Sequence, residues 1–136
     1  MAYFLVKSDP GEYGLEELER DRSTTWDGVK NAQALQAIRA MKRGDRVFFY
    51  HSGGSSAIVG LAKAASAPRA DPKDEKLAIV DLAFAARLDP PVTLAEIKAE
   101  AVFATWALVR QSRLSTMAAP PEFVEWMRKR YPKVKI

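Results

Sequence analysis

The sequence predicts an α+β fold, a small mixed, mostly antiparallel β-barrel with flanking short helices. Segments rich in aromatic and β-branched residues recur along the chain, and short helical patterns interrupt them. They do so without the regular strand–helix alternation of a doubly wound sheet. The chain has 136 residues, of which 48% are hydrophobic and 28% charged. This length and composition suit a single domain, residues 1–136, with its own core.

The first 44 residues predict one strand and two helices. Residues 3–7 form an aromatic and β-branched run that ends at the turn cluster Ser-Asp-Pro-Gly of residues 8–11. Residues 15–18 carry leucines at a helical spacing, which predicts a short acidic helix. Residues 31–41 place apolar side chains on one stripe, so an amphipathic helix is expected there. Gly44 is a natural left-handed stop after it.

The central third predicts strands. Residues 46–52 form a continuous apolar run that ends in polar groups, typical of a strand buried on both faces. Residues 57–65 form a second strand, which we expect to be weakened or bulged at Gly60. Residues 77–88 are strand-like although rich in alanine, and we expect them to pair antiparallel with the preceding strand. The polar residues 68–76 between them are expected to form a loop.

The last third mixes both element types. Thr93 and Glu96 match the capping box of a short helix. Residues 102–110 are ambiguous between helix and strand, and residues 112–117 predict a last short strand. A Pro-Pro pair at residues 120–121 then opens a closing helix.

Composition excludes several classes of chemistry. The chain has no cysteine, so it offers no disulfide framework, thiolate nucleophile or sulfur-ligated metal. It has no P-loop, no Gly-x-Ser-x-Gly elbow and no paired histidines. We therefore expect no cofactor, no metal and no catalytic residues. The apolar run at residues 1–7 is too short for a signal peptide or a membrane span, which favours a cytoplasmic protein that uses no membrane.

Charge is distributed unevenly, although the formal net charge is only +4. Residues 1–27 carry 3 basic and 7 acidic side chains, whereas residues 110–136 carry 7 basic and 2 acidic ones. A basic C-terminal face opposite an acidic N-terminal one would orient a polyanion on one side of the domain.

The segment Trp26-Asp27-Gly28-Val29-Lys30-Asn31 carries the most informative pattern. An indole precedes an Asp-Gly turn that leads into the helix expected over residues 31–41. Asp27 is suited to cap the start of that helix, and Gly28 tolerates the backbone angles of the turn. An aromatic face beside backbone donors suits a pocket that stacks a planar group and hydrogen-bonds its edge. The alternative is that Trp26 is a core residue.

Several segments, in this order along the chain, resemble the EVE domain family of the PUA-like superfamily, which is related to YTH domains. They are Lys-Ser-Asp-Pro at 7–10, the hexapeptide at 26–31, Gly-Asp at 44–45 followed by Phe-Tyr-His-Ser at 49–52, Ile-Val-Gly at 58–60, and residues 108–115.

The resemblance implies a PUA-like barrel and a binding module without catalytic activity. It also implies DNA or RNA as partner, with a pocket for a flipped, modified base. Two positions depart from the usual family pattern, because Asp9 stands for glutamate and Lys30 for arginine. The second change replaces a bidentate donor by a point charge.

A base pocket needs a stacking face, edge donors and acceptors, and positive charge. Trp26 supplies the face, and Asn31 offers a donor and an acceptor. The candidate base-binding residues are Lys7, Ser8, Trp26, Asn31, Tyr50, His51, Ser52, Gln111, Ser112 and Arg113. Lys30 and Arg110 are the candidate phosphate contacts.

Each candidate also has a structural interpretation. Asn31 could be a local helix cap, and His51 a hydrogen-bonded structural histidine. Lys7 could mark only the exit of a strand to solvent. Arg110 or Arg113 could form a salt bridge to the acidic N-terminal segment.

Two other functions compete with a monomeric base reader. The first is an enzyme acting on a nucleotide or small amide, with His51 as general base assisted by Asp27 or Tyr50. The second is a protein–protein adaptor that uses the closing helix. Exposure of both Phe123 and Trp126 would favour the adaptor, and their burial would exclude it.

Overall fold

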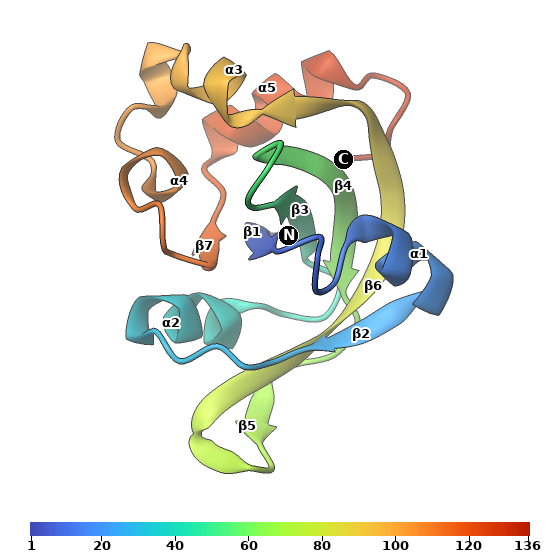
Figure 1. Cartoon of the computed structure of the whole chain (residues 1–136), viewed down its shortest axis with the longest axis vertical. Helices are drawn as coiled ribbons and strands as arrows, with labels where there is room; N and C mark the ends of the chain where they lie inside the picture. Colours follow the sequence, from blue (N-terminus) through green and yellow to red (C-terminus); the bar gives the residue numbers. More distant parts are fainter.

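One curled sheet forms the frame of the molecule in the computed structural model, which describes residues 1–136. Its strand order is β2-β6-β4-β3-β1-β7, and β5 pairs with β6 (Figure 1). Only β1 and β3 are parallel, so the expected mostly antiparallel sheet is confirmed. The strands are β1 (Tyr3–Ser8), β2 (Ser23–Trp26), β3 (Arg46–His51), β4 (Ala57–Ala64), β5 (Arg69–Asp71), β6 (Asp74–Thr93) and β7 (Thr116–Ala118).

Short helices flank this half-barrel (Figure 1). They are α1 (Leu15–Asp21), α2 (Ala32–Ala40), α3 (Leu94–Lys98), the 3₁₀ turn η1 (Ala101–Phe103), α4 (Ala107–Arg110) and α5 (Pro121–Arg130). None of them has the length and apolar character needed to cross a bilayer.

Helix α2 begins at a cap that differs from the expected one. The side chain of Asn31, not that of Asp27, accepts the hydrogen bond from the Ala34 N–H, at 3.0 Å. Asp27 lies too early in the chain, because the turn through Gly28, with φ of +73°, is followed by two extra residues before the cap. The expected capping box of Thr93 and Glu96 is confirmed at the start of α3.

Strand β6 is longer than the residues 77–88 that the sequence predicted. It has 20 residues and includes the Pro-Pro pair at 90–91, and the expected loop at 68–76 contains β5. The strand continues because different stretches of it pair with β5, β2 and β4 (Figure 1). Pro90 and Pro91 lie near its end, where the register against β4 is irregular, so the lost N–H groups interrupt little pairing.

Of the two possibilities at Gly60, a bulge is the one observed: the register shifts between Ile58 and Gly60 against both neighbouring strands. A Cβ at Gly60 would lie 2.5 Å from Leu15 Cδ1 and 3.0 Å from the Ala86 carbonyl oxygen. Glycine is therefore required here because α1 packs directly on the strand.

Other boundaries also differ from expectation. Strand β2 was not predicted, because its four residues carry no long apolar run. The ambiguous residues 102–110 are helical, forming η1 and α4. The last strand, expected over residues 112–117, is shorter and later: it is β7, Thr116–Ala118, and it pairs with β1.

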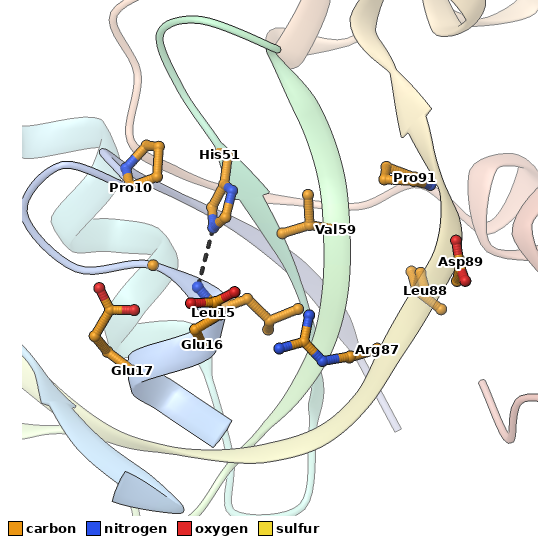
Figure 2. A pocket seen from close by; sticks show the side chains of 11 residues that line it. Pro10, Leu15, Glu16, Glu17, His51, Val59, Arg87, Leu88, Asp89 and Pro91 are labelled. Carbon is orange, nitrogen blue, oxygen red and sulfur yellow. Dashed lines mark hydrogen bonds between the residues drawn. The ribbon is translucent and has the colours of Figure 1, made fainter. Parts of the chain in front are cut away.

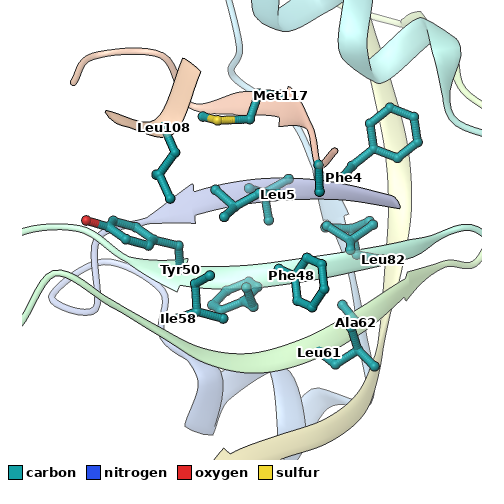
Figure 3. Packing of buried hydrophobic residues seen from close by; sticks show 14 of the residues in the cluster. Phe4, Leu5, Phe48, Tyr50, Ile58, Leu61, Ala62, Leu82, Leu108 and Met117 are labelled. Atoms are coloured by element: carbon teal, nitrogen blue, oxygen red, sulfur yellow. The ribbon is translucent and has the colours of Figure 1, made fainter. Parts of the chain in front are cut away.

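The core lies between the strands and the helices that cover them. Figure 3 shows Leu5, Phe48, Ile58, Leu108 and Met117 among the side chains of this one core cluster. Tyr50, a candidate pocket residue, is only 3% exposed and belongs to this core. It was misassigned because the end of β3 is covered on both faces.

Helix α5 closes the core with aromatic side chains. Phe123 is 0% exposed, and Trp126 packs on Phe103 and Phe123 with ring centroids 5.5 and 5.7 Å apart. The paired exposed aromatics that a docking helix requires are absent. Trp126 is only half-buried, so the adaptor hypothesis for this helix lacks its required pair of exposed aromatics.

Candidate functional site

A pocket of about 440 Å³ forms beside the indole of Trp26, and we call it the Trp26 pocket. Three separate segments build it: the end of β1 with the following loop, the stretch from β2 to the start of α2, and the residue before β7. Its lining residues are Lys7, Ser8, Asp9, Glu12, Tyr13, Thr24, Thr25, Trp26, Asp27, Gly28, Val29, Lys30, Asn31 and Ser115. Five of the predicted residues thus meet there: Lys7, Ser8, Trp26, Lys30 and Asn31.

Trp26 is held by its edges. Its Nε1–H donates to Thr116 Oγ1 at 3.3 Å. Its ring contacts that of Phe49 edge to face, with the ring centroids 6.4 Å apart. Trp26 ends β2 and Thr116 begins β7, which are the two outer strands of the sheet. The half-buried indole is therefore fixed in orientation while it lines the pocket.

Asn31 is the local helix cap that the sequence offered as one interpretation, and it also lines the Trp26 pocket. Its Oδ1 caps α2, which leaves the side-chain NH₂ group without a partner in the chain. It also lines the Trp26 pocket, so this group is available as a hydrogen-bond donor. The neighbouring Lys30 is exposed and forms no ion pair.

Lys7 lines the Trp26 pocket and is half-buried, so it does more than mark the exit of β1 to solvent. Its Nζ donates to the Ser112 carbonyl oxygen at 3.1 Å and lies 5.6 Å from the centre of the Tyr50 ring. Partial burial lowers the pKa of Lys7. Ser8 is only 8% exposed, and its hydroxyl donates to the Tyr13 carbonyl, so it shapes the loop around the pocket.

The predicted residues Arg110, Gln111, Ser112 and Arg113 do not line the pocket. They lie in the exposed segment joined to it through the bond between Lys7 and Ser112. Neither Arg110 nor Arg113 forms an ion pair, which contradicts the alternative that they pair with the acidic N-terminal segment. Their guanidinium groups are free to meet a ligand that extends beyond the pocket.

His51 lies in a different cavity, of about 520 Å³, which we call the His51 pocket (Figure 2). Its Nε2 accepts the Leu15 N–H at 3.0 Å. Burial lowers the pKa of His51, and the Glu17 carboxylate opposes this shift. His51 does not line the Trp26 pocket. The buried Phe49 contacts both rings, with its ring centroid 6.4 Å from that of Trp26 and 6.0 Å from that of His51.

Ser52 lines neither pocket, which corrects its predicted place. Its backbone N–H donates to the Ser8 carbonyl at 2.9 Å and so fixes the loop after β1.

Sequence reasoning missed several residues of the Trp26 pocket as site residues: Asp9, Glu12, Tyr13, Thr24, Thr25, Asp27, Gly28, Val29 and Ser115. The turn at residues 8–11 was visible, but nothing in it indicated that the loop would fold back towards Trp26. The alternation of Thr24 and Trp26 in β2 is the one local signal that places both side chains on the same face.

Comparisons with known proteins agree with this architecture. The family model of the EVE domain matches residues 2–130. Human thymocyte nuclear protein 1 is 30% identical over 125 residues, covering 71% of this chain and 56% of that protein, and the mouse protein is 34% identical over 124 residues, covering 71% and 55%. This chain therefore spans about half the length of these relatives.

Solved structures share the fold over the whole chain. The NMR structure of a Rhodopseudomonas palustris protein is 36% identical, with a TM-score of 0.91, and the match covers 100% of this chain and 97% of that one. Human thymocyte nuclear protein 1 in complex with 5-methylcytosine-containing DNA is 24% identical, with a TM-score of 0.87 and coverage of 99% and 100%. With its family match over residues 2–130, this chain belongs to the EVE domain family.

Proposed function

We propose that this protein is a non-enzymatic module that binds nucleic acid and accommodates a flipped, modified base in the Trp26 pocket. The observation that carries the proposal is the assembly of an edge-anchored indole with hydrogen-bonding groups from three distant segments. Its volume of about 440 Å³ lies in the usual range of small-molecule sites. A base on this face would gain about 1–3 kcal/mol from stacking.

A relative supports DNA as the partner. Human thymocyte nuclear protein 1, which has the same fold, has been solved with DNA that contains 5-methylcytosine. We propose DNA or RNA with a modified base as the ligand class, and a 5-substituted pyrimidine as the first probe.

Free positive charge near the pocket supports contact with the nucleic-acid backbone. Lys30, Arg110 and Arg113 are exposed and unpaired. Each is suited to meet a phosphate next to a base held by the indole.

The geometry disfavours the enzyme alternative, in which His51 is a general base assisted by Asp27 or Tyr50. Asp27 lines the Trp26 pocket, Tyr50 is in the core, and neither lines the His51 pocket. The Nε2 lone pair of His51 is occupied by the Leu15 N–H, so this nitrogen is not available as a general base.

Burial of a methyl group alone contributes too little free energy for strong selectivity. Burying one methylene-sized group contributes only about 0.8 kcal/mol, which is a few-fold in affinity. We therefore expect selectivity for a modified base to depend on enclosure against Trp26.

The test is a binding titration with labelled oligonucleotides that carry one cytosine or one 5-methylcytosine. Trp26→Ala should weaken binding of the modified strand by about 5- to 150-fold, because the stacking contribution is lost. Trp126→Ala is the matched control, since that indole packs on Phe103 and Phe123 outside the pocket. Thermal unfolding should show that each variant folds. Equal, salt-sensitive binding of both strands that neither variant changes would contradict a base pocket.

A further inference from the structure

Helix α1 begins without a side-chain cap of its own. Its N-cap residue is Gly14, which has no side chain to accept the first free N–H groups of the helix. His51 at the end of β3 takes this role, because its Nε2 accepts the Leu15 N–H at 3.0 Å (Figure 2). A residue 36 positions away along the chain therefore holds the start of α1.

The segment between β1 and α1 contributes to both pockets. Asp9, Glu12 and Tyr13 line the Trp26 pocket, whereas Pro10 and Gly14 line the His51 pocket. This segment leads directly into the first turn of α1. A change in how that turn is held can therefore alter one wall of the Trp26 pocket.

The hydrogen bond between Leu15 and His51 requires a neutral imidazole. A protonated imidazole carries a hydrogen on both nitrogens, so its Nε2 would be a donor that faces the Leu15 N–H donor. His51 is the only histidine of the chain. Histidine is the side chain whose ordinary pKa places its change of charge between about pH 5 and 8. Burial lowers the pKa of His51, and the Glu17 carboxylate opposes this shift.

Glu17 offers a second partner to the protonated imidazole. A Cβ built on Gly14 would lie 3.4 Å from His51 Nε2 and 3.5 Å from Glu17 Oε2, so these two atoms border the same point. Because residue 14 is glycine, no side chain occupies that point. Glu17 forms no ion pair in the chain, so its carboxylate is available to accept from an imidazolium.

The other charged groups that line the His51 pocket come from α1 and β6. They are Glu16, Arg87 and Asp89. The Arg87 guanidinium is paired with Glu19 at 2.7 Å, and the carboxylates of Glu16 and Asp89 belong to exposed residues. No charged side chain from β4 or from the segment after β1 lines this pocket. The half-buried Glu17 is therefore the best placed acceptor for a charged His51.

We propose that protonation of His51 switches its partner from the Leu15 N–H to the Glu17 carboxylate, frees the start of α1 and so weakens nucleic-acid binding in the Trp26 pocket. This inference rests on the proposed function of that pocket. The neutral imidazole holds the shared segment in place, and the charged one releases it. Binding and protonation are then linked, because one proton must leave His51 before the pocket wall is restored.

The experiment follows His51 and binding over the same pH range. An NMR titration of the imidazole gives its folded-state pKa. Titrations of a labelled oligonucleotide that carries one 5-methylcytosine give the affinity at each pH. We expect the affinity to be constant above that pKa and to fall by up to about tenfold for each pH unit below it.

His51→Gln removes the proton and keeps the cap. Glutamine retains an acceptor for the Leu15 N–H and does not titrate. Its affinity should match that of the original chain at neutral pH and should stay constant as the pH falls.

Glu17→Gln tests the second partner. The variant removes the charge that accepts from the imidazolium, so the pKa of His51 and the midpoint of the affinity loss should both move to lower pH. Glu16→Gln is the matched control, because it removes the same charge from the same turn of α1, and it should move both values less. Equal shifts in the two variants would overturn the role of Glu17.

The outcomes separate this proposal from the proposed function. Binding that Trp26→Ala weakens, but that stays constant while His51 titrates, would overturn the proton control and leave the base pocket standing. The same pH dependence in His51→Gln would overturn the role of His51. Unfolding of the chain before His51 is protonated would also overturn the switch, since no folded, charged form would exist. Binding that Trp26→Ala leaves unchanged would overturn the pocket and its control together.

Discussion

The Trp26 pocket and the His51 pocket have similar volumes, about 440 and 520 Å³, and share the segment between β1 and α1. They differ in which groups are free. Beside His51, the guanidinium of Arg87 is paired with Glu19 at 2.7 Å, and the other charged lining residues are Glu16, Glu17 and Asp89. Beside Trp26, Lys7 and Lys30 have no carboxylate partner. Both pockets also carry carboxylates, so the two differ in their unpaired cations and aromatic face and not in volume, and these differences support the proposed contact with a polyanion.

The largest effect that we expect to distinguish the two pockets is on protein stability. Gly60→Ala should push its Cβ into Leu15, which lines the His51 pocket, and against the Ala86 carbonyl. We expect the free energy of unfolding to fall by about 1–3 kcal/mol, measured by urea denaturation. Gly14→Ala is the matched control on the same pocket, since its Cβ would have only ordinary contacts, the nearest at 3.4 Å. Equal losses in both variants would contradict this packing.

Asn31 allows its structural and binding roles to be separated. Asn31→Ala should cost about 0.5–2 kcal/mol of stability, because the Ala34 N–H loses its acceptor. Asn31→Asp keeps the cap but replaces the NH₂ donor in the Trp26 pocket by a second acceptor. It should leave the unfolding midpoint nearly unchanged and weaken oligonucleotide binding. If both properties change together in Asn31→Asp, the two roles are not distinct.

Substitutions of Lys30 and Arg87 compare the contributions of the cations in the two pockets to nucleic-acid binding. Removing one phosphate contact from B-DNA binding reduces the slope of log affinity against log salt by about 0.9. Lys30→Ala should show this change in titrations at several salt concentrations. Arg87→Ala should not, because Arg87 is engaged by Glu19. A slope that falls in both variants would indicate a diffuse electrostatic contact.

The smallest expected effect is the pH dependence of stability that His51 causes. Burial lowers the pKa of His51 below its ordinary value of 6.5, so the unfolded chain binds this proton more readily. The contribution of His51 to stability is therefore complete above pH 6.5 and is lost as the pH falls from 6.5 through the folded-state pKa. His51→Gln, which does not titrate and keeps an acceptor for the Leu15 N–H, should reduce this dependence in unfolding experiments. Identical pH profiles would show that other groups cause it.

Local patterns in the sequence predicted much of the fold. Capping at Thr93, the bulge at Gly60 and the buried strand at Arg46–His51 depend on neighbours close in sequence or on a residue's own conformational range. Strand β2 and the full length of β6 were missed because their stability comes from pairing partners far along the chain, which a single sequence does not display.

The same distinction applies to the Trp26 pocket. The hexapeptide at residues 26–31 indicated Trp26 and Asn31, because the turn at Gly28 and the helix cap that place them are local to this segment. His51 and Tyr50 were misplaced because the end of β3 looks polar in sequence, whereas its side chains point into the core and into a second cavity. Which side of a strand faces which cavity is decided by tertiary packing.

The hydrogen bond from Trp26 to Thr116 spans 90 positions of the chain. During synthesis, an emerging polypeptide therefore cannot form this wall until the segment that includes Thr116 has left the ribosome. A fragment that stops before residue 116 would lack the hydrogen bond that orients the indole. If the pocket binds a base as proposed, a chain that ends before residue 116 would therefore not orient the indole in this way.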